Sequence, residues 1–230
     1  MTPTHQPVQP VMLATVQQDS EARGGSERVT LTIIVQNLQK KAELATRLVE
    51  RDAPDILLAQ ELSLHSEATN LFRAHYTSRM GYGTAIHCRG KITNVRRVKS
   101  PVAEFGGFIY KKTTVADCDG VQCVSFHGYN GTPFRRNISS LVSHLQAVLD
   151  VLGSGPAIFA GDFNSWTTDH LNAVSELLYS VGFHRAFSWP YPGGDRELDH
   201  AFLRGMKLLQ GSTFETEADH LGAKLIVEHI

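Results

Sequence analysis

The segment Ala157-Ile158-Phe159-Ala160-Gly161-Asp162-Phe163-Asn164-Ser165-Trp166 joins an apolar run to a polar turn. The apolar run predicts a buried strand, and a helix-like pattern opens directly after the segment. Asp162 and Asn164 stand two residues apart, so both side chains project from the end of the strand toward one place. A carboxylate orients water or a metal ion, and a carboxamide donates to a phosphoryl oxygen without adding negative charge. Taken alone, the motif is also typical of an ordinary strand-to-helix turn with Asx capping.

Toward the N-terminus, two apolar runs enclose a helical pattern. Residues 29–35 and 56–59 predict buried strands, and residues 41–50 carry apolar side chains at helical spacing. The two strands lead into Asn37 and Glu61. A strand, a helix and a strand in succession form a βαβ-like opening, and sites are built at the ends of such strands.

The rest of the chain alternates between short β patterns and helical patterns. The expected strands cover residues 83–87, 107–110, 113–115, 121–126, 157–159, 198–203, 207–209 and 223–227, and the expected helices cover 134–152 and 171–181. Residues 89–99 hold five cations, which predicts a solvated hairpin surface or, alternatively, a groove that contacts phosphates.

Composition indicates an ordinary globular protein of 230 residues, with 42% hydrophobic and 20% charged residues. We expect one domain over residues 29–230 and a disordered extension over residues 1–28, which are rich in Pro, Gln, Ser and Gly. No 18-residue apolar stretch could cross a membrane, and the start lacks the pattern of a secretory signal. The three cysteines form no metal-binding pattern, so a reducing, cytoplasmic location is expected.

Polar side chains collect at the predicted strand ends and in the neighbouring loops. They are Asn37, Glu61, His127, Asp162, Asn164, Asp199, Asp219 and His220. Oxygen ligands of this kind select Mg2+ or Mn2+ over zinc, and a histidine with an acidic partner acts as a base. Asn130, Arg135 and Arg136 are candidates for binding phosphate, although the arginines also suit a solvated helix start.

In order and spacing, these motifs resemble the endonuclease/exonuclease/phosphatase superfamily. That superfamily includes deoxyribonuclease I, apurinic endonucleases, bacterial sphingomyelinases and inositol polyphosphate 5-phosphatases. The resemblance covers residues 29–230 and is greatest to nuclease-like bacterial members. It implies a four-layer α/β sandwich, in which two mainly antiparallel β-sheets pack face to face and helices cover them.

The resemblance also implies a metal site. Glu61 would be the principal ligand of Mg2+, with Mn2+ as the alternative, and Asn37 and Asp219 would lie close by. The apurinic branch carries an acidic residue two positions after its asparagine. Gln39 stands there in this chain, which weakens the case for a second metal ion.

On the phosphate side, the resemblance implies that Asp162 aligns the attacking water and Asn164 holds a non-bridging oxygen. His220, paired with Asp199, would act as general base or as donor to the phosphate. His127 would stabilise the pentavalent phosphorane or assist the leaving group, and its acidic partner is not identifiable from the sequence.

Three functional hypotheses remain at this point. The first is a Mg2+-dependent phosphodiesterase acting on nucleic acid, as a DNA endonuclease, with Trp166 either stacking on a base or packing in the core. The second keeps the chemistry but takes a phospholipid head group or a small phosphoester; residues 105–108 and 189–192 are the nearest candidates for a membrane-contacting hairpin. The third is a non-catalytic binding protein, and no partner protein is indicated.

Overall fold

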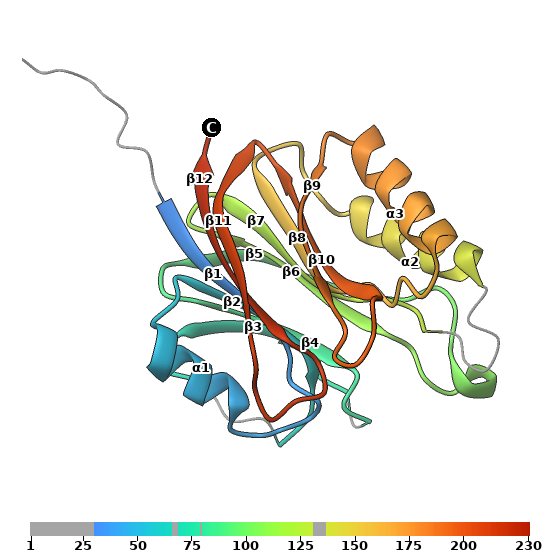
Figure 1. Cartoon of the computed structure of the whole chain (residues 1–230), viewed down its shortest axis with the longest axis horizontal. Helices are drawn as coiled ribbons and strands as arrows, with labels where there is room; N and C mark the ends of the chain where they lie inside the picture. Colours follow the sequence, from blue (N-terminus) through green and yellow to red (C-terminus); the bar gives the residue numbers. More distant parts are fainter. Residues whose placement is uncertain (1–29, 66–68, 79, 131–136) are drawn as a thin grey trace, which may run out of the picture.

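Two β-sheets face each other across the apolar centre of the computed structural model, and helices lie on their outer faces (Figure 1). The structure describes residues 30–65, 69–78, 80–130 and 137–230. The expected extension over residues 1–28, and also Arg135 and Arg136, lie outside the described residues. In the described part of the chain, no helix combines the length and apolar character that crossing a membrane requires.

The first sheet has the strand order β11-β12-β1-β2-β4-β3. Its strands are β1 (Thr30–Asn37), β2 (Ile56–Leu62), β3 (Phe72–Tyr76), β4 (Gly83–Cys88), β11 (Met206–Phe214) and β12 (Gly222–His229). β1 and β2 run parallel and are joined through α1 (Leu44–Asp52), as the predicted βαβ opening requires; the other pairs are antiparallel.

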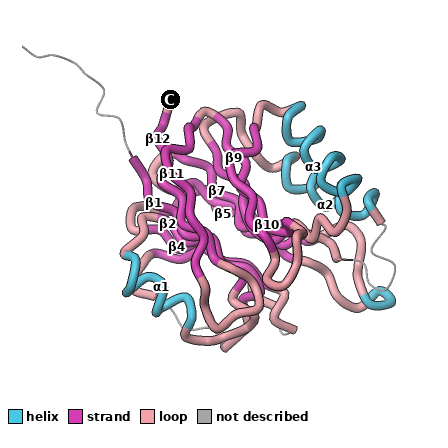
Figure 2. The backbone as a smooth tube through the Cα atoms, viewed as in Figure 1, coloured by secondary structure: helices cyan, strands magenta, loops and turns pink. Residues whose placement is uncertain are grey.

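The second sheet has the strand order β5-β6-β7-β8-β10-β9. Its strands are β5 (Ile92–Lys99), β6 (Lys112–Cys118), β7 (Val121–His127), β8 (Ala157–Asp162), β9 (His184–Pro190) and β10 (Glu197–Arg204). β7 and β8 are parallel and are connected through α2 (Ile138–Leu149), whereas α3 (Thr168–Ser180) follows β8. Figure 2 shows the strands of both sheets between the helices.

Alternation along the central strands explains the layers. In β8, Ile158 and Ala160 face the core between the sheets, whereas Phe159 faces the core beneath α2 and α3. In β1, Ile33 belongs to the core between the sheets and Ile34 to the core beneath α1. Strands covered on both faces read as continuous apolar runs, which is why the sequence predicts them well.

The predicted four-layer sandwich with mainly antiparallel sheets is confirmed, and several element predictions are corrected. Residues 107–110 do not form a strand: one turn of 3₁₀ helix (Phe105–Gly107) lies there, followed by an isolated bridge between Glu104 and Ile109. β3 and β9 were not predicted. Residues 92–99 form an edge strand, in which Arg96 pairs with Asp117.

Buried hydrogen bonds join the two sheets near the carboxyl ends of β2 and β7. Gln60 Nε2 donates to Ser125 Oγ over 2.9 Å, and Ser125 Oγ donates to the Ala59 carbonyl over 2.8 Å. Thr84 and Thr114 make a second link, with Oγ1 atoms 2.9 Å apart. These bonds fix the position of one sheet relative to the other.

Gly161 is needed where β8 passes under this junction. Its φ is +139°, and an added Cβ would lie 2.1 Å from the Phe126 carbonyl oxygen and 2.9 Å from the Gln60 side chain. Gly161→Ala should therefore lower the free energy of unfolding by about 2 kcal/mol or more, measured by urea titration. Gly155→Ala is the control, because its Cβ would meet Gln122 at an ordinary 3.4 Å. Equal losses in the two variants would contradict this account.

Candidate active site

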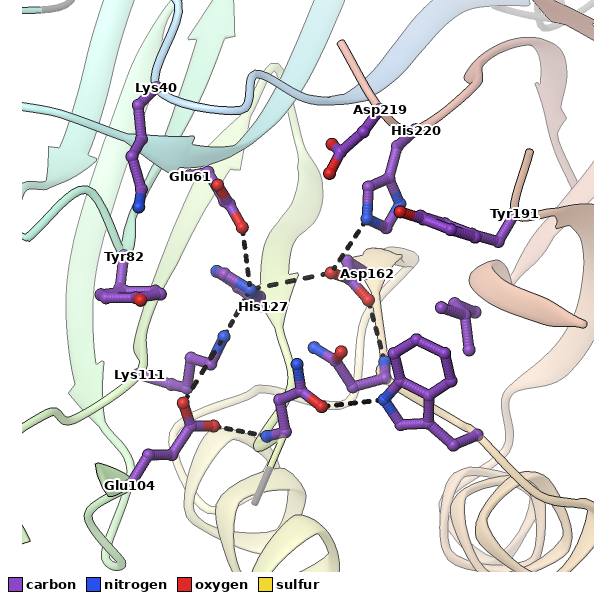
Figure 3. A pocket seen from close by; sticks show the side chains of 14 residues that line it. Lys40, Glu61, Tyr82, Glu104, Lys111, His127, Asp162, Tyr191, Asp219 and His220 are labelled. Atoms are coloured by element: carbon purple, nitrogen blue, oxygen red, sulfur yellow. Dashed lines mark hydrogen bonds and ion pairs between the residues drawn. The ribbon is translucent and has the colours of Figure 1, made fainter. Parts of the chain in front are cut away.

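A pocket of about 220 Å³ opens at the edge of the sandwich where β1, β2, β7 and β8 end (Figure 3). β10 and β12 are antiparallel to their neighbours, so their first residues reach the same edge. The predicted site residues that line it are Glu61, His127, Asn130, Asp162, Asn164, Asp219 and His220. The other lining residues include Lys40, Tyr82, Glu104, Lys111, Trp166 and Tyr191.

A β-bulge directs Glu61 into the pocket. The pairing of β2 with β4 shifts between Gln60 and Leu62, and Glu61 has a φ of +51°. An extra residue in a strand re-aims its side chain, and a non-glycine residue with positive φ is strained. Burial raises the pKa of Glu61, Lys111 opposes this rise, and the carboxylate of Asp162 adds to it.

Three predicted residues lie side by side across the second sheet. Asp162 pairs in register with His127 on β7 and with Asp199 on β10, so the three Cα atoms form one row. Asn37, from the first sheet, donates from Nδ2 to Asp162 Oδ2 over 3.3 Å, and its Oδ1 accepts from the Gln39 amide over 3.0 Å. Asn37 does not line the pocket; it joins the two sheets beside Asp162.

Asp199 orients His220. Its Oδ2 lies 2.7 Å from His220 Nδ1, and His220 Nε2 lies 3.8 Å from Asp162 Oδ2. Burial disfavours the charged ring, but the carboxylates of Asp199 and Asp162 outweigh burial and raise the pKa of His220 to about 10. The ring is thus held with Nε2 toward the pocket.

Asp162 and Asn164 form the predicted turn. Asp162 Oδ1 accepts from the Asn164 amide over 2.9 Å, and Asn164 has a φ of +53°. Asn164 Nδ2 donates to the Gly128 carbonyl over 3.1 Å. The Asx turn and the functional pocket are therefore not alternatives. The hydrogen bond that is typical of an ordinary turn also places the Asp162 and Asn164 side chains in the wall of the pocket.

His127 has a lysine as its close partner. Lys111 Nζ lies 2.5 Å from His127 Nε2, whereas Glu61 Oε1 and Asp162 Oδ2 lie 3.9 and 3.7 Å away. Burial and the Lys111 charge lower the pKa of His127 well below its ordinary value. The lowered pKa favours the neutral ring, whose closest polar partner is the lysine and not a carboxylate.

Aromatic side chains form much of the pocket's rim. Trp166 Nε1 donates to Asn130 Oδ1 over 2.8 Å, so Asn130 holds the indole at the opening. The centroids of the Trp166 and Tyr191 rings are 6.3 Å apart. The Tyr191 and His220 rings meet edge to face, with their centroids 4.9 Å apart. Trp166 is partly exposed here and is not a core residue.

The donor chemistry of the pocket fits a divalent cation. Among the residues that the structure describes, no three acidic, histidine or cysteine side chains gather closely enough to enclose an ion. Mg2+ does not require such a cage, because it is commonly held by one or two carboxylates and completed by water and substrate phosphate. Glu61 and Asp219 line the same pocket and suit that arrangement.

Sequence reasoning missed Lys111, Glu104 and Tyr82 in the pocket wall, although it named Trp166 as a side chain that could stack on a base. Lys111 and Glu104 lie in and beside a segment expected to be a pair of short strands, and Tyr82 directly precedes a predicted strand. One signal was available, because a lysine and a glutamate stand near apolar runs in this part of the sequence. Charged residues are rarely buried without a partner, so a buried pair could have been suspected there. Both are 2% exposed.

Comparison with known proteins finds relatives of similar sequence. A UPF0294 protein of Vibrio campbellii is 29% identical over 184 residues, which cover 72% of this chain and 64% of the relative. A UPF0294 protein of Vibrio cholerae is 34% identical over 107 residues, or 44% of this chain and 37% of the relative. The chain thus spans less than two thirds of these relatives.

Solved structures share the fold at low sequence identity. An endonuclease/exonuclease/phosphatase from Beutenbergia cavernae superposes with a TM-score of 0.67 at 16% identity, covering 87% of this chain and 72% of that one. The 3′ phosphatase NExo from Neisseria, bound to a product DNA hairpin, gives a TM-score of 0.64 at 15% identity over 85% and 98% of the two chains.

Residues 35–220 match the Endonuclease/Exonuclease/phosphatase family, and the match includes every predicted metal, catalytic and phosphate-binding position. By that match and by its two-sheet architecture, the chain belongs to the endonuclease/exonuclease/phosphatase family.

Proposed function

We propose that this protein is a divalent-metal-dependent phosphodiesterase that acts on DNA as an endonuclease. One observation carries the proposal: Glu61 from one sheet, Asp162 and Asn164 from the other, and the His220–Asp199 pair converge on a single pocket. Phosphoryl transfer needs positioning and charge stabilisation more than covalent chemistry, and this set supplies both.

The residues divide the work by position. Glu61 and Asp219 would hold Mg2+ or Mn2+, which supplies Lewis-acid stabilisation of the phosphoryl oxygens when bound. Asp162 aligns the attacking water, and Asn164 holds a non-bridging oxygen. Asp199 keeps His220 Nε2 turned toward the pocket, where the protonated ring would donate to a phosphate oxygen.

DNA is proposed as the substrate because of the rim. Trp166 and Tyr191 are partly exposed beside the pocket, and Lys40 lines it from the opposite sheet. Stacking on aromatic side chains and attraction to phosphates are the usual means of binding nucleic acid. The Neisseria phosphatase of the same fold holds a DNA hairpin. None of residues 89–99 lines the pocket, so they do not enter this argument.

A second candidate is hydrolysis of a phospholipid head group or another small phosphoester. Phe108 favours it, because the side chain is 88% exposed and follows the turn that carries Glu104. An exposed aromatic side chain beside a phosphoesterase pocket suits contact with a membrane surface. The other candidate segment, residues 189–192, does not support it, since Trp189 is 1% exposed.

Hydrolysis should require Mg2+ or Mn2+ and should depend on Glu61, the proposed metal ligand, and on His220. Supercoiled plasmid should be nicked in the presence of Mg2+, and EDTA should abolish nicking. Glu61→Ala and His220→Ala should each lower the rate by roughly a hundredfold or more, because each removes a group that stabilises the transition state. Gel quantification of nicked plasmid measures these rates.

The control for this experiment is Glu176→Ala, an exposed position on α3 that should keep full activity. An abasic duplex, single-stranded RNA, sphingomyelin and an inositol polyphosphate complete the substrate panel. Turnover of only the lipid or the inositol phosphate would replace the DNA proposal with the second candidate. No turnover of any substrate would refute the enzymatic proposal.

The protonation state of His220 can be measured directly. In metal-free protein, the folded-state pKa lies above the ordinary 6.5, so the ring should stay protonated through pH 8 and lose its proton near pH 10. Asp199→Asn should lower that pKa, since it removes both a negative charge and a hydrogen bond. Histidine ring NMR signals followed against pH measure both values.

The matched variant for the titration is Glu176→Gln, which removes a carboxylate from an exposed helix position and should leave the His220 curve unchanged. If the His220 ring of the wild type is already neutral at pH 7, the carboxylates of Asp199 and Asp162 do not raise its pKa as stated here.

A further inference from the structure

Lys111 is a buried lysine at the wall of the pocket. Its side chain is 2% exposed, and Nζ lies 5.0 Å from the centre of the Tyr82 ring. Burying an ammonium group is costly unless it is paired, and among the residues that the structure describes the pairing of Lys111 is incomplete. Glu104 Oε2 is 3.9 Å from Nζ, an ion-pair separation that is too long for a direct hydrogen bond.

Glu104 and His127 hold Lys111 from two sides. The Glu104 side chain is also 2% exposed, and its Oε1 accepts from the Asn130 amide, which anchors the carboxylate. His127 Nε2, 2.5 Å from Nζ, accepts a hydrogen bond from the ammonium group when the ring is neutral. The buried His127 Nδ1 then carries the ring proton, and it has no hydrogen-bond partner within the described structure.

The count of donors leaves part of the ammonium group unused. Lys111 Nζ has three N–H groups, of which His127 takes one and Glu104 faces another. The residue lines the pocket, so the remaining donor is available to a ligand there. A buried ion pair of this kind adds little to stability compared with apolar residues of similar size, which points to a role in the site.

Lys111 also lies where a leaving group would. His127 and His220 lie on either side of Asp162, whose Oδ2 is 3.7 and 3.8 Å from their Nε2 atoms (Figure 3). Lys111 is on the His127 side. In-line displacement at phosphorus places the attacking and leaving oxygens on opposite sides, so an attack from the Asp162–His220 side directs the leaving oxygen toward Lys111.

From this arrangement we infer that Lys111 is a catalytic residue that donates a proton to the leaving oxygen, and that His127 and Glu104 are positioning residues for it. This inference rests on the proposed phosphodiester hydrolysis. His127, for which the family resemblance implied stabilising the phosphorane or assisting the leaving group, acts through the lysine.

The step balances as follows for a diester. Water forms the new P–O bond and gives a proton to the Asp162 carboxylate, while the bond to the leaving oxygen breaks and its electron pair stays on that oxygen. Lys111 Nζ transfers one proton to the oxygen, which departs as an alcohol. Asp162 then loses its proton to solvent and the neutral amine regains one, so no net charge accumulates in the protein.

The test compares two leaving groups on the same thymidine 5′-phosphodiester scaffold. A 4-nitrophenolate ion leaves without protonation, whereas a sugar alkoxide needs a proton. Lys111→Met keeps an unbranched stem out to Cε and removes the Nζ donor. It should lower kcat for the dinucleotide by roughly 10²–10⁴-fold, the usual contribution of a general acid, and should change kcat for the nitrophenyl ester less than about tenfold.

Lys112→Met is the matched control. Lys112 Nζ donates to the Thr77 carbonyl over 2.6 Å and lies over the Tyr76 ring, and the residue does not line the pocket. It should leave both rates unchanged. Equal losses on the two esters in Lys111→Met would overturn the inference, because a merely structural role does not depend on the leaving group. Lys111→Gln replaces Lys111→Met if thermal unfolding shows that the methionine variant is not folded.

A binding measurement separates failure of the inference from failure of the proposed function. Inorganic phosphate should raise the Tm of the wild type and of Lys112→Met, but not of Lys111→Met. If the wild type hydrolyses neither ester, the proposed function fails, and a Lys111-dependent phosphate shift still places the ammonium group at the phosphoryl site. A phosphate shift that survives in Lys111→Met, or is absent from all three proteins, overturns the inference.

Discussion

The buried hydrogen bonds between the two sheets are the constraint on which the pocket depends. The pocket takes Glu61 from β2 and Asp162 from β8, and these strands belong to different sheets. Apolar contact alone holds two sheets together without fixing their relative position to a fraction of an ångström, because the hydrophobic effect is not directional. Directional bonds from Gln60 to Ser125 and from Thr84 to Thr114 supply the missing precision, and they are made within a dry core where unpaired donors are costly.

Strain and buried charge concentrate where these sheets meet. Glu61 and Asn164 adopt positive φ without being glycine, and Lys111, Asp162 and Asp199 are almost fully buried. Each feature opposes stability, and together they cluster around one opening. A protein keeps such local conflicts where function needs them, and the rest of the fold must offset their cost. The continuous apolar strands, which are covered on both faces, supply the stability that offsets this cost.

The sequence predicted the parts of the fold that are set by local pattern. Residues 56–59 and 157–159 are apolar on both faces, and the helices around Leu48 and Leu145 bury one stripe. The edge strands β3 and β9 were missed because their alternate side chains are exposed or half-buried, which leaves little pattern to detect. The pocket shows the same contrast. Residues in short motifs, such as Asp162 and His220, were predicted and do line the pocket. Lys111 was not predicted, since its place depends on a contact with His127, sixteen positions away.

The size of the pocket limits what the proposed catalytic residues alone can recognise. About 220 Å³ accommodates a phosphate group and part of one neighbouring sugar, but not a duplex or a lipid. In the proposed function, all phosphoesters would present the same group to Asn164 and His220, so these residues would not distinguish one substrate class from another. Discrimination must come from side chains at the rim: Trp166, held by Asn130, offers an aromatic face to a base or sugar, whereas the exposed Phe108 offers an apolar one. In the proposed function, substrate choice is therefore a property of the loops that end the strands, and the chemistry is a property of the strands themselves.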